Sequence, residues 1–273
     1  MKAFIINLER SLDRKEYMQK QIQKLFEKNP NLKNKLEFIF FKAVDAKNKE
    51  HLEFKQHFPW WASWVLGREL SDGEKACFAS HYKLWQECVK IDEPIIILED
   101  DVEFSDEFLN NGEEYIEELS KSEYEYVRFC YLFDKKFYPL NENYILSFEK
   151  LAGTQGYVLK PSAAKKFIKY AKRWIYPVDD YMDMFYKHKV LNIVKKPLLL
   201  KHDCKLESEI SNLGRTNKKL KIHRKIAREI SNLGRTNKKL KIHRKIAREI
   251  FRLYRDISRL LYIFYIKKKL NLK

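Results

Sequence analysis

The most informative part of the chain is a run of three carboxylates that directly follows an apolar segment. In the string IIILEDDV, Glu99, Asp100 and Asp101 come at the end of a short continuous apolar stretch, which is typical of a buried strand. Extended backbone directs Glu99 and Asp101 to one side. Neighbouring anions repel unless a cation or hydrogen-bond donors balance them, and hard ions such as Mg²⁺ and Mn²⁺ prefer oxygen ligands. The string indicates a metal–diphosphate site or, equally, a solvated acidic turn.

A second acidic group lies in the string YPVDDYMD. We expect a helix to begin after Pro177. On that helix Asp179 and Asp183 share one face at i, i+4 spacing, while Asp180 points elsewhere. Either face could supply a general base. The alternative is a set of acids that favour the positive end of the helix dipole.

The segment 70–89 carries Ser80 and His81 and is predicted to be an amphipathic helix. Ser71, with Glu74 three residues later, predicts its N-terminal cap. The Ser80–His81 pair is not a nucleophilic dyad, because adjacent helical residues point about 100° apart. We expect His81 to be structural, with no zinc partner at ligand spacing, and Cys77 in the same helix to be a packed thiol.

Thr154 and Gln155 lie between two glycines in the string GTQGYVLKP. Gly153 and Gly156 permit a close approach of the backbone to a ligand. The chain has neither a P-loop signature nor GxGxxG, so a P-loop kinase or an ordinary dinucleotide reductase is poorly supported. A metal–diphosphate site built from acidic strand ends is the remaining nucleotide option.

The elements that must position these residues alternate along the chain. Strands are predicted over 2–7, 36–41, 94–98, 126–132 and 156–159, and helices over 12–26, 71–89, 104–119 and 162–171. This alternation predicts an α/β fold, with a mostly parallel sheet and helices on both faces. Ligands bind beyond the carboxyl ends of such strands, where Asp45 and the acidic run fall.

The charge of the 273-residue chain is unevenly distributed. Its net charge is +17, and residues 209–273 hold 21 basic and 4 acidic residues, so residues 1–208 are neutral overall. The sequence therefore predicts a globular domain over 1–208 and a basic tail over 209–273. A surplus confined to one segment favours a polyanionic partner for that tail.

The tail contains a perfect tandem repeat, in which residues 209–228 recur at 229–248. Because the two copies have not diverged at any position, they indicate a recent duplication rather than a solenoid. Apolar residues at 3–4 spacing, interleaved with Arg and Lys to the chain end, predict a basic amphipathic helix. An anionic membrane surface is the favoured partner. Nucleic acid is the less favoured alternative, because RNA-binding motifs are absent.

Cysteine usage and hydropathy bear on the compartment. The four cysteines form no CxxC pair, which predicts reduced thiols in a cytosolic setting. The N-terminal apolar run is too short for a secretory signal, and no apolar run of roughly 18 residues occurs. We therefore expect neither export nor a transmembrane helix.

Together and in this order, the motifs resemble glycosyltransferase family 25, the galactosyltransferases of bacterial lipopolysaccharide and lipooligosaccharide biosynthesis. The resemblance covers about 1–208. It is carried by the strings INLERSLDR (6–14), AVDAK (43–47), LSDGEKACFASHYKLW (70–85), ILEDDV (97–102), GTQGYVLKP (153–161) and PVDDYMD (177–183).

The resemblance implies a GT-A-like, Rossmann-type nucleotide-sugar domain. Its reaction would transfer galactose from UDP-galactose, with inversion to a β linkage, to a core sugar of lipooligosaccharide. Mn²⁺ or Mg²⁺ would be the cofactor. The enzyme would lie on the cytoplasmic face of the inner membrane, where its lipid-linked acceptor resides. The alternatives are a transferase for another UDP-hexose and a non-catalytic protein that binds sugar nucleotide or nucleic acid.

The resemblance also implies a role for each site residue. The acidic run takes the place of the family's DxD element, with Glu99 in the first position and Asp101 in the last. Asp179 is the expected base, with Asp180 and Asp183 as alternatives. The expected metal ligands are Asp101, Glu99 and His202, and the expected donor-binding residues are Asn7, Arg10, Arg14, Asp45, Ser80, His81, Glu99, Asp100, Thr154 and Gln155.

Overall fold

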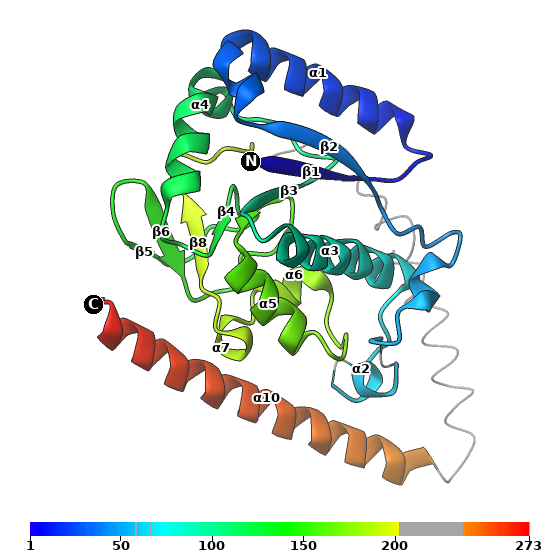
Figure 1. The fold of residues 1–273 in the computed structure, drawn as a ribbon. Helices are drawn as coiled ribbons and strands as arrows, with labels where there is room; N and C mark the ends of the chain where they lie inside the picture. The colour runs from blue at the N-terminus through cyan, green and yellow to red at the C-terminus, as the bar shows by residue number, and fades with distance from the viewer. Residues whose placement is uncertain (58, 66, 202–236, 273) are drawn as a thin grey trace.

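A computed structural model describes residues 1–57, 59–65, 67–201 and 237–272. Within these residues a central sheet of eight strands is covered by helices on both faces (Figure 1). The strands are β1 (Lys2–Asn7), β2 (Glu37–Lys42), β3 (Ile95–Glu99), β4 (Tyr126–Arg128), β5 (Phe137–Pro139), β6 (Tyr144–Ser147), β7 (Gly156–Leu159) and β8 (Asn192–Lys195). The α-helices are α1 (Leu12–Lys28), α2 (Pro59–Val65), α3 (Asp72–Ile91), α4 (Asp106–Lys121), α5 (Pro161–Tyr170), α6 (Val178–Met182), α7 (Phe185–His188) and α10 (Asn237–Lys269).

The sheet is mixed, in the order β2-β1-β3-β7-β4-β8-β6-β5. Strands β2, β1 and β3 are parallel, and so are β4 and β8. The prediction of a mostly parallel sheet holds at this core but is wrong for β7, which runs antiparallel between β3 and β4. It also misses the β5–β6 hairpin, which pairs antiparallel with β8 at one edge. An apolar strand such as GYVL reads the same in either direction, so its composition does not reveal its orientation.

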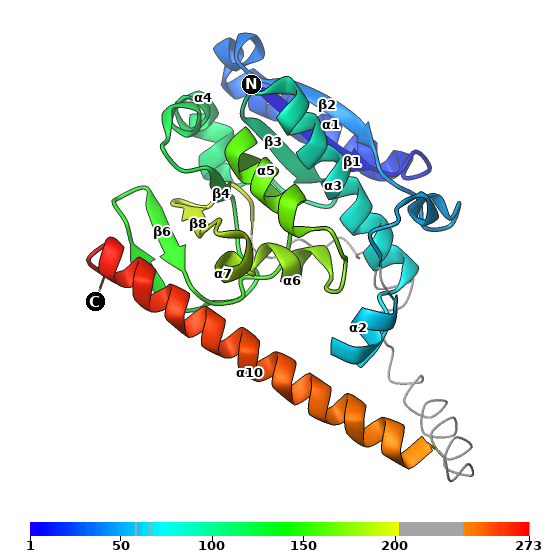
Figure 2. The same cartoon turned by 60° about the horizontal axis from the view of Figure 1, so that its bottom comes forward.

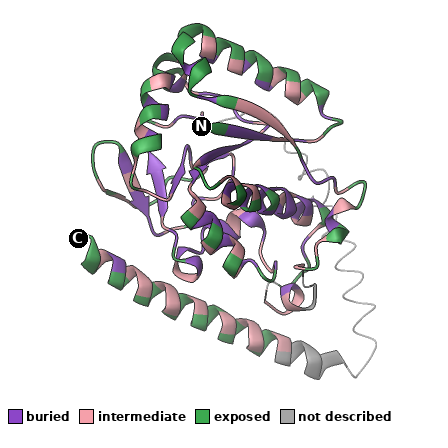
Figure 3. Ribbon diagram, viewed as in Figure 1, coloured by how far each residue is buried: buried purple, intermediate pink, exposed green. Residues whose placement is uncertain are grey.

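Alternation along the strands divides the core between the two faces of the sheet. Ile96 and Leu98 of β3 pack in one cluster with residues of α1 and α4, while Ile95 and Ile97 pack in another with residues of α3 and α5. Both faces of β3 are buried, which explains why its sequence is continuously apolar. Figure 3 shows the buried residues concentrated along the sheet and on α3. Helices on both faces were predicted, and the two clusters confirm them.

Helix α3 begins at a complete capping box. The Ser71 hydroxyl accepts from the Glu74 backbone N–H, and the Glu74 carboxylate accepts from the Ser71 N–H. Arg68 adds two hydrogen bonds of 2.7 Å to the same carboxylate. The cap predicted from Ser71 and Glu74 is confirmed, and it fixes the start of the helix that carries Cys77 and His81.

Helix α10 crosses the outside of the body near α2 and α7 (Figures 1 and 2). Phe251 meets the ring of Trp61, and Tyr262 lies beside Phe185. Ile266 is only 4% exposed and belongs to the same core cluster as α1 and α4. The repeat copy 209–228 and the start of the next copy lie outside the described residues. Over the parts of the chain that the structure describes, every helix is too short or too polar to cross a membrane.

Candidate active site

Two adjoining cavities lie beside the carboxyl ends of β1 and β3. The first, of about 110 Å³, is lined by Arg10, Arg14, Asp45 and neighbouring residues, and the second, of about 320 Å³, by Gly153, Thr154, Asp179 and others. Three residues line both cavities: Cys77, Glu99 and Asp101. Parallel pairing of β1 with β2 and β3 sets Asn7, Lys42 and Glu99 at one edge of the sheet, as the position of the motifs after strands predicts.

Asp100 is held by two residues from the start of the chain. Asn7 Nδ2 donates to its Oδ2 at 2.7 Å, and Arg14 Nη1 donates to its Oδ1 at 3.0 Å. Burial raises the pKa of Asp100 above its usual value, although both donors act in the opposite direction. Asn7 also donates to the Ser11 carbonyl, which ties the end of β1 to the start of α1. These contacts assign Asn7 and Asp100 to the framework of the first cavity.

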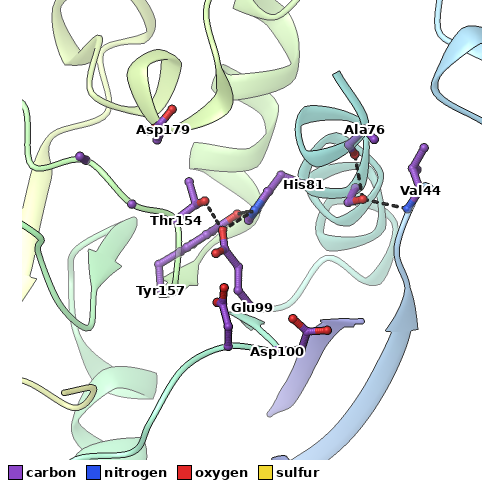
Figure 4. Close-up of polar contacts among 12 residues, drawn as sticks. Val44, Ala76, His81, Glu99, Asp100, Thr154, Tyr157 and Asp179 are labelled. Carbon is purple, nitrogen blue, oxygen red and sulfur yellow. Dashed lines mark hydrogen bonds and ion pairs between the residues drawn. The ribbon is translucent and has the colours of Figure 1, made fainter. Parts of the chain in front are cut away.

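Glu99 is surrounded by hydrogen-bonding groups (Figure 4). The Thr154 hydroxyl donates to its Oε1, and His81 Nε2 lies 3.4 Å from the same atom. Burial alone would raise the pKa of Glu99, but His81 and Thr154 outweigh it and hold that pKa below its usual value. Glu99 is therefore the member of the acidic run whose charged form its surroundings favour.

Asp101 is the last of the three carboxylates. Arg14 Nη1 lies 3.7 Å from its Oδ2, and the Asp101 side chain is 18% exposed. Burial, together with the charge of Glu99, raises the pKa of Asp101 to about 7. The pKa values of Asp100 and Asp101 are thus both raised by burial beside Glu99, and the carboxylate oxygens of the run suit a hard divalent cation. Glu99 and Asp101 fit that role, whereas His202, the third expected ligand, lies outside the described residues.

Asp45 and Arg10 form an ion pair on the wall of the first cavity. The Lys47 backbone N–H also donates to the Asp45 carboxylate, at 2.8 Å. Burial would raise the pKa of Asp45, but the hydrogen bond from Arg10 and that from Lys47 lower it below its usual value. Arg10 keeps 30% of its side chain exposed and lines the first cavity.

Ser80 connects α3 to the segment that follows β2. Its hydroxyl donates to the Ala76 carbonyl and accepts from the Val44 N–H, both at 2.9 Å (Figure 4). The side chain is 1% exposed. Both bonds are internal, so Ser80 shapes the wall of the first cavity and leaves its hydroxyl engaged.

The three aspartates of YPVDDYMD line two different cavities. Asp179 lines the second cavity with Glu99 and Asp101. Asp180 pairs with Lys150 and lines a different cavity, next to α10. Asp183 follows the last residue of α6 and lines the same cavity as Asp180, not that of Asp179, despite the i, i+4 spacing.

An ion pair in the core holds the turn that carries Thr154 and Gln155. Arg128 Nη2 lies 2.8 Å from Asp183, and Arg128 Nη1 donates to the carbonyls of Ala152 and Gly153 at 2.9 Å. The Ala152 N–H donates to Asp183 in turn, at 3.0 Å. Ala152 and Gly153 have φ of +54° and +69°, the left-handed region that this turn requires. Arg128 was not among the residues predicted from the sequence, although an arginine within the apolar string YVRFCYLF could have indicated it.

Gln155 contributes its backbone and side chain to the same edge. Its carbonyl accepts from the Glu99 N–H at 2.9 Å, and its side-chain oxygen lies 3.1 Å from the Cys130 thiol. Gln155 also lines the second cavity. Within the described residues, Cys77, Cys88 and Cys130 form no disulfide bond.

In an α/β fold, acidic residues at adjacent strand ends mark the edge of the sheet where ligands bind. Comparison with known proteins defines the family: residues 1–182 match the model of glycosyltransferase family 25, described as an LPS biosynthesis protein. The chain belongs to glycosyltransferase family 25.

Similar proteins come from bacteria, viruses and animals. The chain is 31% identical over 175 residues to the lipooligosaccharide biosynthesis protein lic2B of Haemophilus influenzae, covering 60% of each chain. It is 31% identical over 180 residues to a procollagen lysyl hydroxylase and glycosyltransferase of Acanthamoeba polyphaga mimivirus, covering 61% of this chain and 19% of that protein. It is 26% identical over 203 residues to mouse procollagen galactosyltransferase 2, covering 68% and 31%. The chain thus spans between a fifth and three fifths of these relatives.

Proposed function

We propose that this protein is an inverting β-galactosyltransferase that uses UDP-galactose and acts on a lipooligosaccharide core sugar. Family membership supports glycosyl transfer, and the names of the bacterial and animal relatives support lipooligosaccharide and galactose. The observation that carries the proposal is that Glu99, Asp101 and Asp179 line one cavity. A GT-A-like classification of the mixed sheet is part of the proposal.

The first cavity is assigned to the nucleotide. Arg10 and Arg14 both line it and carry the positive charge that a diphosphate requires. Asp45, beyond the end of β2, is assigned to the ribose or base side. Ser80 and His81 form the α3 wall of the same cavity.

Glu99 and Asp101 are assigned to a divalent cation, Mn²⁺ or Mg²⁺. When bound, such an ion would balance the charge that develops on the departing UDP. Asp100 keeps both of its oxygens engaged with Asn7 and Arg14, so it positions the run. Thr154 orients the Glu99 carboxylate, and Arg14 lies near both aspartates.

Asp179 is assigned as the general base that takes the proton of the acceptor hydroxyl as that oxygen attacks the anomeric carbon. It lines the second, larger cavity, which we assign to the sugar and the acceptor. Asp180 and Asp183 are weaker choices, because both line a different cavity, next to α10.

Helix α10 is assigned to an anionic membrane surface, on the cytoplasmic face where the lipid-linked acceptor would lie. Apolar residues at 3–4 spacing face away from the body and are about half exposed or more: Ile246, Ile250, Leu253, Ile257, Leu260 and Phe264. We call this set the α10 stripe. Basic residues accompany it, among them Arg252 and Lys268, and each Lys or Arg near an anionic surface adds about 1 kcal/mol to binding.

The test is a panel of UDP-sugars with a truncated lipooligosaccharide acceptor, with and without Mn²⁺. We expect UDP-galactose to be the donor and Asp179→Asn to lower kcat by about 10²-fold or more with the fold intact. Asp180→Asn is the matched control and keeps activity within a few-fold. Preference for another UDP-hexose would overturn the galactose assignment. Equal activity of the Asp179→Asn variant and the wild type would overturn the role of the base.

A further inference from the structure

Three side chains of different chemistry converge on the wall between the two cavities. Cys77 and His81 are one turn apart on α3, and Glu99 ends β3. One potential ligand atom from each lies within 4.8 Å of the other two. The expectation that His81 has no partner at zinc-ligand spacing is therefore wrong, because a cysteine four residues earlier lies on the same helix face.

The environment of the His81 ring also points to a bound ligand. Its side chain is completely buried, and Nδ1 lies 2.8 Å from the Tyr157 hydroxyl. That hydroxyl also accepts from Trp85 Nε1, at 3.1 Å. The other ring nitrogen, Nε2, has no hydrogen-bond partner, although it lies 3.4 Å from Glu99 Oε1. A buried nitrogen left without a partner is costly, so something that binds a lone pair would be favoured there.

The contact with Tyr157 sets up the imidazole for this task. When a cation occupies the site, Nδ1–H donates to Tyr157, and Nε2 presents to the ion a lone pair in place of the proton that faces Glu99 in the metal-free protein (Figure 4 shows His81, Tyr157 and Glu99 together). A ligating histidine in proteins is usually fixed in this way, by a hydrogen bond from its second nitrogen.

We propose that Cys77, His81 and Glu99 form a binding site for a thiophilic divalent cation, with Zn²⁺ as the best match. Thiolate, imidazole and carboxylate are the ligands that Zn²⁺ takes, with a fourth position left to water or a ligand. Ligand atoms around Zn²⁺ lie about 3–4 Å apart, so the His81–Glu99 distance already fits and the cluster must contract by about 1 Å. Cys77 is only partly buried and lines both cavities, which gives its Sγ room to move.

Occupation of this site has a consequence for catalysis that rests on the proposed function. Glu99 would be shared between the thiophilic ion and the Mn²⁺ or Mg²⁺ assigned to the acidic run. Zn²⁺ at Cys77 and His81 would therefore draw Glu99 away from the cation that serves the donor. It would act as an inhibitor that Mn²⁺ alone does not reverse.

The experiment is a Co²⁺ titration of the full, reduced, metal-free chain, because Co²⁺ bound to a thiolate gives a charge-transfer absorption in the near ultraviolet. We expect this band in the wild type and its displacement by Zn²⁺. Cys77→Ser abolishes the band, and His81→Gln weakens Co²⁺ binding by about tenfold or more. Cys88→Ala and Cys204→Ser are the matched controls and keep the band.

A wild type without the band, or a band that survives Cys77→Ser, overturns the proposal. If Cys77→Ser does not fold, an alkylation experiment on the wild type takes the place of the variant. We expect Zn²⁺ to protect Cys77 from iodoacetamide, as measured by mass spectrometry. Unprotected alkylation then overturns the proposal. Both readouts are independent of glycosyl transfer, so a failed donor assay leaves this result interpretable.

Discussion

Arg128 and Asp183 form an ion pair 2.8 Å apart in which neither side chain is more than 2% exposed. The pair lies between the turn at Ala152–Gly153 and Asn192 of β8, and every polar contact described above for Asp183 is internal. Asp183 is thereby a positioning residue for the turn that brings Thr154 to Glu99.

Removing Asp183 should destabilise the fold strongly. Asp183→Ala leaves the Arg128 guanidinium buried without its counter-charge, at a cost of about 3–5 kcal/mol in the free energy of unfolding. Asp180→Ala, which removes an exposed pair with Lys150, should cost less than about 1 kcal/mol. Urea denaturation of the two variants measures the difference. Equal stabilities would show that the buried pair does not hold the turn.

The stability of the metal-free protein should depend on pH through Asp101. The pKa of Asp101 is about 7 in the fold, against 3.8 in an unfolded chain, so between these values only the native state binds the proton. The free energy of unfolding therefore falls as pH rises from about 4 to 7. Asp101→Asn should be more stable than the wild type at pH 8, by a few kcal/mol at most, and no more stable at pH 4. Thermal unfolding with a chelator present gives the comparison. A gain that is the same at both pH values would contradict the assignment.

The affinity for Mn²⁺ should rise with pH, whereas the free energy of unfolding of the metal-free protein falls. The proton on Asp101 must leave before its oxygen can coordinate, so affinity should rise with pH, by up to tenfold per unit, and level off above about 7. Calorimetric titration between pH 5.5 and 8 measures this rise. In Asp101→Asn the affinity should be low and nearly independent of pH. A wild-type affinity that is flat across this range would exclude Asp101 as a ligand.

Membrane association should depend on the α10 stripe. The double variant Leu253→Ser, Leu260→Ser removes two side chains that are 63% and 66% exposed, and it should lower binding to anionic vesicles by tenfold or more. Leu12→Ser, at an equally exposed leucine on α1, is the control and should bind as the wild type does. Co-sedimentation with vesicles at several salt concentrations is the measurement. If the wild type and these variants bind RNA in a salt-dependent manner and do not bind vesicles, nucleic acid would be favoured as the partner.

Local patterns in the sequence predicted the parts of the fold that depend on local chemistry. The strand Lys2–Asn7 and the strand Gly156–Leu159 were predicted with their observed bounds, because apolar runs bounded by polar residues set both. The capping box at Ser71 was predicted because its two hydrogen bonds join residues three apart. Residues at the ends of parallel strands come together by topology, which explains why Asp45 and the acidic run Glu99–Asp101 could be placed at one edge of the sheet.

The remainder depended on contacts between distant segments. Arg128 and Asp183 are separated by 55 positions, and no local pattern pairs them. The placement of Asp179 in one cavity and of Asp180 and Asp183 in another follows from the shortness of α6 and from partners on other elements. The convergence of Cys77 and His81 on Glu99 depends on how α3 packs over β3, which composition does not encode.

One side of helix α10 packs against the body of the protein, and the other side, which carries the α10 stripe, is exposed. Ile266 is embedded in a core cluster, and two nitrogens of Arg259 donate to the Phe148 carbonyl, at 3.2 and 2.7 Å. At the proposed membrane surface, the exposed side of α10 would contact the lipid. The packed side would fix the tilt of the whole molecule relative to the bilayer. The height of the catalytic cleft above the headgroups would then be a property of side-chain packing, and loosening Arg259 or Ile266 would change which sugars of a lipid-anchored chain come within reach.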